Sequence, residues 1–185
     1  MEVKGLFKNF GKKMIFNNYS VSIPDKKVTF IMGESGSGKT TLLRMIMGLD
    51  KDFKGEISSD HKKISCVFQE PRLLPALDVE ENIKLVENGS SLSIDEILGL
   101  VELSNEKKLY PSELSGGMKM RLSIARAIYY NGDMFLMDEP FSALDKDMKD
   151  RILPRIFEVI KNKTVIIVSH SIEDAKTYAD NIIKI

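Results

Sequence analysis

The residues of this chain that are best suited to chemistry form a glycine-rich stretch. In order they are Gly33, Glu34, Ser35, Gly36, Ser37, Gly38, Lys39 and Thr40, with Thr41 next. Three glycines allow a tight turn whose N–H groups face an anion, and the helix expected after them adds positive potential at its N-terminus. In such a loop Lys39 reaches the terminal phosphates, and the Thr40 hydroxyl ligates Mg²⁺. The spacing therefore predicts a nucleoside triphosphate site; the alternative is a chance glycine-rich turn.

Two acids, Asp138 and Glu139, follow an apolar run much later in the chain. An acid that ends such a strand lies at the edge where open α/β sheets bind ligands. Asp138 would hold Mg²⁺ through water, and Glu139 would polarise the water that attacks the phosphate. Alone, the two acids would equally suit a solvated turn before Pro140. Beside a phosphate loop, hydrolysis is the favoured interpretation.

Three further features are weaker when each is taken alone. Ser115 with Gly116 and Gly117 begins a helical run, which makes a second anion-binding helix start or a plain glycine-rich cap. Gln69 follows a predicted strand and would reach Mg²⁺ or the attacking water, although isolated glutamines are usually surface residues. His170 ends an apolar run and would hydrogen-bond the γ-phosphate, although a histidine at a strand end is often structural.

These residues need a sheet to position them. A buried strand over Val28–Met32 leads into the loop, and a helix over Thr40–Leu49 leaves it, which is the context a phosphate loop requires. Other apolar runs suit a parallel sheet. They predict strands at Ile64–Phe68, Asp133–Asp138, Thr164–Ser169 and Ile182–Ile185. The predicted fold class is α/β, with a mostly parallel sheet.

The first 24 residues have a different pattern. Weak alternation predicts two antiparallel strands near Val3–Lys8 and Tyr19–Ile23, with a turn at Asn9–Gly11. We therefore expect a small antiparallel β subdomain before the parallel sheet.

Residues from about 72 to 130 predict a mostly helical subdomain inserted between strands. Asp78 with Glu81 and Ser93 with Glu96 have the spacing of capping boxes, and Glu87–Ser91 predicts a turn between the two helices.

A later apolar stripe predicts another helix, packed on the core. Its members are Met148, Ile152, Leu153, Ile156, Phe157 and Ile160. Pro154 lies inside this stripe, so it either kinks the helix or marks a late start.

Composition limits the choice of partners and location. The 185 residues suit one domain, 1–185, and are 43% hydrophobic and 29% charged. Lys plus Arg equals Asp plus Glu, 27 each, so net charge does not favour nucleic acid as a partner. No apolar stretch approaches the roughly 20 residues that cross a bilayer, and the segment Met1–Lys4 lacks the apolar region of a signal peptide. We expect a cytoplasmic protein.

Taken together, these motifs resemble the ATP-binding cassette (ABC) ATPase family along nearly the whole chain. Leu114–Met118 is similar to the family signature Leu-Ser-Gly-Gly-Gln, with Met118 in place of glutamine. The resemblance implies that Gln69 is the Q-loop residue, Ser142–Asp145 the D-loop with Asp145 near nucleotide, and His170 the switch histidine. Phe10 is similar to the aromatic residue that stacks on adenine; the alternative is a turn aromatic packed on its own subdomain. ATP and Mg²⁺ are the implied ligands.

The resemblance also implies partners. In the family, the signature loop of one subunit closes over ATP held by the other, so a second ATPase subunit is expected, as a homodimer or a paired homologue. Phe68–Pro75 and Tyr110–Met118 look like importer cassettes for nitrate, sulfonates and taurine. Such a cassette drives a transmembrane permease from the inner face of the membrane, in some systems with an extracytoplasmic solute-binding protein. Residues 70–85, including Leu73 and Leu74, would be the docking surface, although those leucines would equally suit burial.

Other functions compete with transport. An ABC ATPase of DNA repair or chromosome structure would carry long coiled-coil inserts, and a translation factor would carry two cassettes. A cassette that drives a membrane complex such as that of cell division, without moving solute, stays an alternative. A small-molecule kinase would have no use for Ser115–Gly117.

Overall fold

A parallel sheet of five strands, in the order β5-β6-β7-β3-β8, is the centre of the computed structural model, which describes residues 1–87 and 89–185. Every neighbouring pair of strands in it is parallel. The strands are β3 (Val28–Met32), β5 (Ile64–Val67), β6 (Met134–Asp138), β7 (Thr164–Val168) and β8 (Asn181–Lys184). The predicted α/β class and these strands are confirmed, with no end displaced by more than a single residue.

Parallel pairing places the predicted chemistry at one edge of this sheet. In the register, Asp138 of β6 pairs with Val168 of β7, and Val168 pairs with Ile31 of β3. The carboxyl ends of these three strands therefore lie side by side. The loop after Met32, the acids at Asp138 and Glu139, and His170 all leave the sheet at this edge.

A second, antiparallel sheet of three strands has the order β2-β1-β4. Its members are β1 (Glu2–Phe10), β2 (Lys13–Ser22) and β4 (Lys54–Ser58). The antiparallel pair was predicted, but Tyr19–Ile23 was too short for β2, and β4 was not predicted. Both strands are mostly exposed, and register shifts interrupt the pairing of β1, so neither shows the alternation that reveals a strand.

The helices cover the parallel sheet. They are α1 (Lys39–Ile46), α4 (Gly116–Tyr130), α5 (Lys146–Val159) and α6 (Ile172–Tyr178). The helix predicted over Thr40–Leu49 ends early, because Gly48 has a φ of 71° and turns the chain. Helix α5 begins at Lys146 and continues through Pro154, so the late start allowed by the sequence is wrong.

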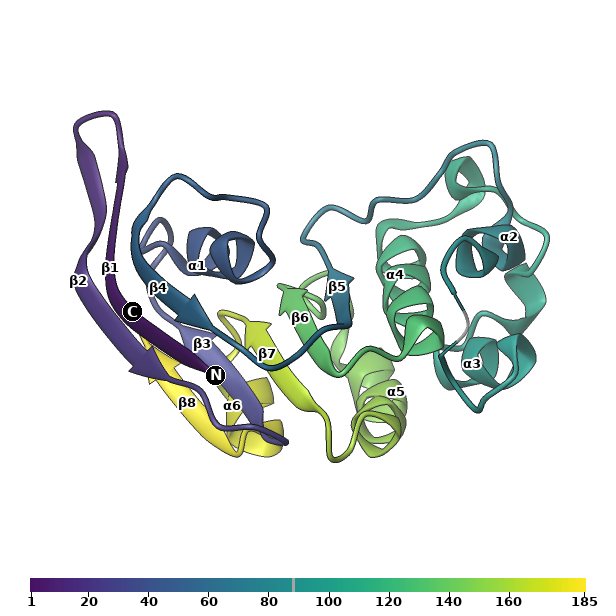
Figure 1. Cartoon of the computed structure of the whole chain (residues 1–185). Helices are drawn as coiled ribbons and strands as arrows, with labels where there is room; N and C mark the ends of the chain where they lie inside the picture. The colour runs from purple at the N-terminus through teal and green to yellow at the C-terminus, as the bar shows by residue number, and fades with distance from the viewer. Residues whose placement is uncertain (88) are drawn as a thin grey trace.

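The predicted helical subdomain contains α2 (Val79–Lys84), α3 (Ile94–Leu100) and 3₁₀ turns at Ser104–Glu106 and Pro111–Glu113. Both capping boxes are present, with Asp78 and Ser93 as the N-caps. The turn predicted at Glu87–Ser91 includes position 88, which lies outside the described residues. Helices α2 and α3 lie at the opposite end of the molecule from β1 and β2 (Figure 1).

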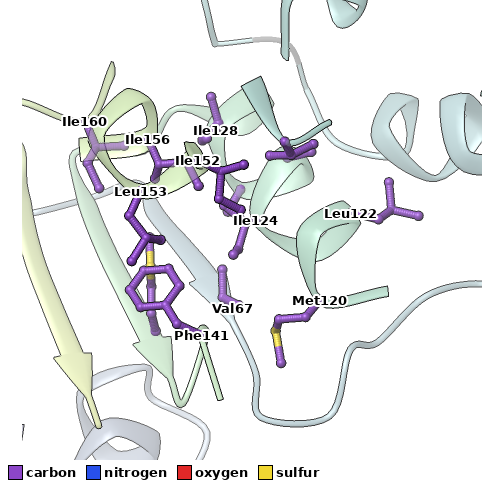
Figure 2. Packing of buried hydrophobic residues seen from close by; sticks show 14 of the residues in the cluster. Val67, Met120, Leu122, Ile124, Ile128, Phe141, Ile152, Leu153, Ile156 and Ile160 are labelled. Carbon is purple, nitrogen blue, oxygen red and sulfur yellow. The ribbon is translucent and has the colours of Figure 1, made fainter. Parts of the chain in front are cut away.

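The core has two parts, one on each face of the parallel sheet. On one face α4 and α5 pack their apolar stripes against the sheet and Phe141, as Figure 2 shows for Ile124, Ile128, Ile152 and Ile156. On the other face α1 and the antiparallel strands pack against alternate strand residues such as Leu136 and Ile166. Among the residues the structure describes, no helix has both the length and the hydropathy to span a membrane.

The segment before α2 is held by one buried amide. Asn82 is fully buried, accepts from Leu74 N at 2.9 Å, and donates to Leu74 O at 3.1 Å and Leu77 O at 2.8 Å. Because backbone groups of an irregular segment have no ladder partners, this side chain takes their place.

We predict that Asn82→Ala lowers the free energy of unfolding by about 2–3 kcal/mol, because several buried polar groups lose their partner together. The melting temperature should fall by about 4–10 °C for a chain of this size. Thermal denaturation followed by circular dichroism measures it. The exposed Asn105→Ala is the control and should stay within about 0.5 kcal/mol. Equal stabilities of the two variants would contradict the role of Asn82.

Candidate functional site

A cavity of about 540 Å³ opens at the carboxyl edge of the parallel sheet. It brings together most of the predicted site residues, from segments far apart in the sequence. Its walls are Phe10, Lys13, Ile15, Ser35, Gly36, Gly38, Lys39, Thr40, Thr41, Gln69, Asp138, Glu139, Ser142, Val168 and His170. The volume lies in the range of small-ligand and cofactor sites.

The glycine-rich loop forms one wall of this cavity. Gly36 and Gly38 have φ values of 79° and 106°, a conformation that a residue with a Cβ rarely adopts. The side chain of Lys39 is folded back across the loop, and Nζ donates to Gly33 O at 2.9 Å and Glu34 O at 2.7 Å. The loop therefore holds a buried ammonium beside the N-terminus of α1, which is an arrangement for binding phosphate.

Two side-chain oxygens that could bind a metal ion, one from Thr40 and one from Asp138, lie next to each other where α1 faces β6. The Thr40 hydroxyl donates to Asp138 Oδ1 at 3.2 Å, and burial raises the pKa of Asp138 although Thr40 and Lys39 oppose the shift. Within residues 1–87 and 89–185 there is no group of three or more His, Cys, Asp or Glu side chains that could hold a metal. A hydroxyl, a carboxylate and the nearby Gln69 fit Mg²⁺, which completes its shell with water and phosphate oxygens.

Glu139 has an unusual backbone. Its φ is 48° although it precedes Pro140, a position that favours extended conformations. Three hydrogen bonds hold it there: Glu139 N donates to Val168 O at 2.9 Å, and Ser142 donates to Glu139 O from its backbone N at 3.3 Å and its Oγ at 2.9 Å. In this conformation the Glu139 side chain lines the cavity at the end of β6.

The Glu139 carboxyl lies close to His170 and is partly buried. Oε1 is buried without a well-formed hydrogen bond, and His170 Nε2 lies 3.4 Å away. Burial raises the pKa of Glu139, while the charge of His170 acts in the opposite direction. A carboxylate in this state has an unused acceptor, and such groups act as general bases toward water.

Phe10 closes the cavity on the side of the antiparallel sheet. The residue is 53% exposed at the end of β1, so it is not packed into its own subdomain. Lys8 Nζ lies 4.8 Å from the ring centroid, and it also donates to Asp50 Oδ1 at 3.0 Å. One face of the ring is thus supported from within the protein. A stacking role for the exposed ring stays a prediction.

Several predicted residues lie outside the cavity. Gly33, Glu34 and Ser37 line an adjoining apolar hollow that also includes His170. Ser115 caps α4 by accepting from Met118 N at 3.2 Å, and Asp145 caps α5 by accepting from Met148 N at 2.8 Å.

The signature segment lies beside the predicted D-loop and is open to solvent. The position of a Cβ on Gly117 is 3.0 Å from Ala143 O, and nothing lies within 4 Å of such an atom on Gly116. Ser115 and Gly116 are exposed. None of the residues of this segment lines the cavity beside the chain's own phosphate loop.

Sequence reasoning did not place four residues of the cavity wall at the site, although the resemblance had assigned Ser142 to the D-loop; they are Lys13, Ile15, Ser142 and Val168. For Ser142 the signal was its place three residues after Glu139. For Lys13 it was a basic pair directly after the turn that follows Phe10. Ile15 and Val168 carried no signal that separates them from other strand residues.

The sequence and the fold both match known proteins. The sequence pattern of a family described as "ABC transporter" matches residues 16–142. Aliphatic sulfonates import ATP-binding protein SsuB 1 of Paracoccus denitrificans is 35% identical, over 98% of this chain and 77% of that protein. SsuB 2 of Rhodococcus jostii is 36% identical, over 99% of this chain and 77% of its own length.

Two solved structures of one dimeric bacterial ABC transporter cassette are also similar. The first has a TM-score of 0.86 at 29% identity, and covers 99% of this chain and 94% of that one. The second, a post-hydrolysis state bound to ADP and Pi, also has a TM-score of 0.86 at 29% identity, and covers 100% of this chain and 93% of that one.

The buried acids lead to a prediction about stability. Because the folded pKa of Glu139 is raised, the folded chain binds more protons than the unfolded chain between the ordinary and the raised pKa, and stability is lost as pH rises through that interval. We predict that ligand-free Glu139→Gln melts about 2–4 °C above the wild type at neutral pH, or about 1 kcal/mol. The gain should vanish below about pH 4, where the carboxyl is protonated in both states.

Thermal melts at several pH values measure this difference. The exposed Glu56→Gln is the matched control and should show no gain at any pH. A Glu139→Gln variant that is no more stable than the wild type at neutral pH would show that burial of this carboxylate has no net cost.

Proposed function

The chain belongs to the ABC transporter family of ATP-binding cassettes, and we propose that it is the ATP-hydrolysing subunit of an importer, acting on a separate membrane permease. One observation carries the proposal: Lys39, Thr40, Asp138, Glu139 and His170 all face one cavity beside a glycine loop. No simpler phosphate-binding role needs the strained glutamate or the histidine beside it.

Each residue has a part in hydrolysis that follows from its position. The loop N–H groups and Lys39 hold the β- and γ-phosphates. Thr40 and Asp138, with Gln69, would hold Mg²⁺, which supplies positive charge to the phosphate oxygens. Glu139 accepts a proton from water as the water oxygen bonds to the γ-phosphorus and the bond to ADP breaks. His170 hydrogen-bonds the γ-phosphate from the next strand, and its contact with Glu139 joins the two groups.

The ATP site is completed by a second subunit. Ser115 and the exposed Gly116 form the capped start of α4, and neither residue lines the cavity beside the chain's own phosphate loop. A head-to-tail homodimer would bring this segment and Asp145 of one chain to the phosphate loop of the other. The similarity to dimeric cassettes supports this arrangement.

The permease would dock beside the Q-loop. A hollow of about 200 Å³ lies between α1 and Phe68–Arg72, and it shares Gln69, Thr40 and Asp138 with the ATP site. Leu74 is 48% exposed next to it, whereas Leu73 packs against the core and would not contribute. Because the same residues border both cavities, docking and ATP binding would influence each other.

The names of the relatives support import over the alternatives. SsuB proteins are named as import ATP-binding proteins for aliphatic sulfonates. We infer a position at the cytoplasmic face of the membrane and, through the permease, an extracytoplasmic solute-binding protein. The described cavity is assigned here to ATP, so we assign the choice of solute to those partners.

We predict that Lys39→Ala weakens MgATP binding by at least about a hundredfold, equal to about 3 kcal/mol, because the phosphates lose their buried cation. Isothermal titration calorimetry measures the affinity. Lys161→Ala, an exposed lysine far along the chain, is the charge-matched control and should bind like the wild type. Unchanged affinity in Lys39→Ala would refute the phosphate loop.

The composite site has its own test. Glu139→Gln should bind ATP without hydrolysing it and accumulate as a dimer. Adding Ser115→Arg should keep that protein monomeric, while ATP affinity changes by less than about twofold, since each chain retains its own loop. Analytical ultracentrifugation with ATP separates the species. Ser104→Arg, exposed in the helical subdomain, is the control and should leave the dimer intact. A dimer that persists with Ser115→Arg would contradict composite sites.

A further inference from the structure

The β1–β2 hairpin brings a cation to the ATP cavity that no role described so far uses. Lys13 is the first residue of β2, is exposed, and lines the cavity beside the phosphate loop. Its backbone belongs to the β1–β2 ladder, but within residues 1–87 and 89–185 its side chain has neither a hydrogen bond nor an ion pair. Its neighbour Lys12 is equally exposed but is not part of the cavity wall.

Strand β2 packs against the phosphate loop, and two of its residues on one face each lie near one glycine of the loop. Ile15 Cγ2 would be 2.6 Å from a Cβ on Gly38, and Lys13 Nζ would be 3.7 Å from a Cβ on Gly36. Residues two apart in a strand share a face, and the two glycines are also two apart in the loop. The contact of Ile15 with Gly38 thus fixes the strand, and the strand places the Lys13 ammonium above Gly36.

The same face of the hairpin carries Phe10. Phe10 and Lys13 are directly paired in the register of β1 and β2, so their side chains project to the same side. Both line the cavity. An aromatic ring and an ammonium placed next to each other match the two chemical parts of a nucleotide, its base and its phosphates.

The charges in the cavity favour an anion near Lys13. Lys39 is folded back onto its own loop, while the carboxylates of Asp138 and Glu139 lie at the sheet edge. A triphosphate carries more negative charge than Lys39 alone balances. A second ammonium within reach of the loop would add a charge-assisted contact from the other side.

We propose that Lys13 binds a phosphate oxygen of ATP from the hairpin side, so that the triphosphate is clamped between Lys13 and Lys39. This deepens the proposed function and rests on it. The hairpin then recognises the phosphates as well as the base. Because Lys13 is exposed and unpaired, its substitution should not alter folding.

The test compares three variants by calorimetry with MgATP and with inorganic tripolyphosphate, which has no base. Lys13→Gln should weaken both ligands by about five- to tenfold, the size expected of one partly exposed charge-assisted contact. Lys12→Gln, the matched control, should change neither by more than about twofold, and Lys13→Arg should restore most of the loss. The loss in Lys13→Gln should shrink at high salt, where exposed charges are screened.

Each other result has a defined meaning. If the wild type does not bind ATP, the proposed function fails, and this inference fails with it. If the wild type binds but Lys13→Gln equals Lys12→Gln, only the clamp is refuted. A loss for ATP without any loss for tripolyphosphate would also refute it, since Lys13 would then support the base or ribose.

Discussion

Parallel pairing of β3, β7 and β6 is the constraint on which the rest of this structure depends. Ile31, Val168 and Asp138 share one register line across the three strands. Because successive strand residues point to opposite faces, a slip of one residue in β6 would move Asp138 away from Thr40 and bury it among the core residues that now flank it. The other residues of β6 are apolar on both faces, with Met134 and Leu136 on one and Phe135 and Met137 on the other, so the slip is costly mainly because of the acid at its end. The strand register that forms the core therefore also sets the position of Asp138 relative to the phosphate loop.

The site at this edge contains groups that lower the stability of the ligand-free chain, and a bound ligand would offset part of that loss. Burial raises the pKa of both Asp138 and Glu139, and Glu139 has both a left-handed backbone and a buried Oε1 without a well-formed hydrogen bond. The lysine of the loop, meanwhile, uses backbone carbonyls as its partners. Strain and unsatisfied groups of this kind persist only where surrounding structure holds them, as the three hydrogen bonds to the Glu139 backbone do. These local costs in stability are concentrated where the two acids and the cation line one cavity.

The sequence predicted the parts of this fold whose local pattern and tertiary environment agree. Val28–Met32 is a run that is apolar except for the buried Thr29 and ends at a glycine, and its predicted bounds were correct. The exposed strand β4 lacked such a run, and α6 was missed although Ser171 caps it by accepting from Asp174 N. The loop, the two acids and His170 were found because each lies at the end of an apolar run. Lys13 was not, because its place in the cavity depends on how the hairpin packs over Gly38, and no local pattern encodes that contact.

The packing of the hairpin is also stabilised by a buried lysine of β1. Lys8 is 3% exposed, and its ammonium donates to Asp50 Oδ1 at 3.0 Å and Asp52 O at 2.6 Å, in the segment that follows α1. Without these acceptors the buried Lys8 ammonium would have lost its partners, so the contacts hold β1 to the segment Asp50–Asp52. The same ammonium lies against the Phe10 ring. Through Lys8 the hairpin is thus joined to the segment after the phosphate-loop helix, and through Ile15 it is joined to the loop itself. The aromatic ring, Lys13 and the loop are consequently parts of one unit, whereas the exposed signature segment does not line their cavity, which is why the proposed site takes that segment from a second chain.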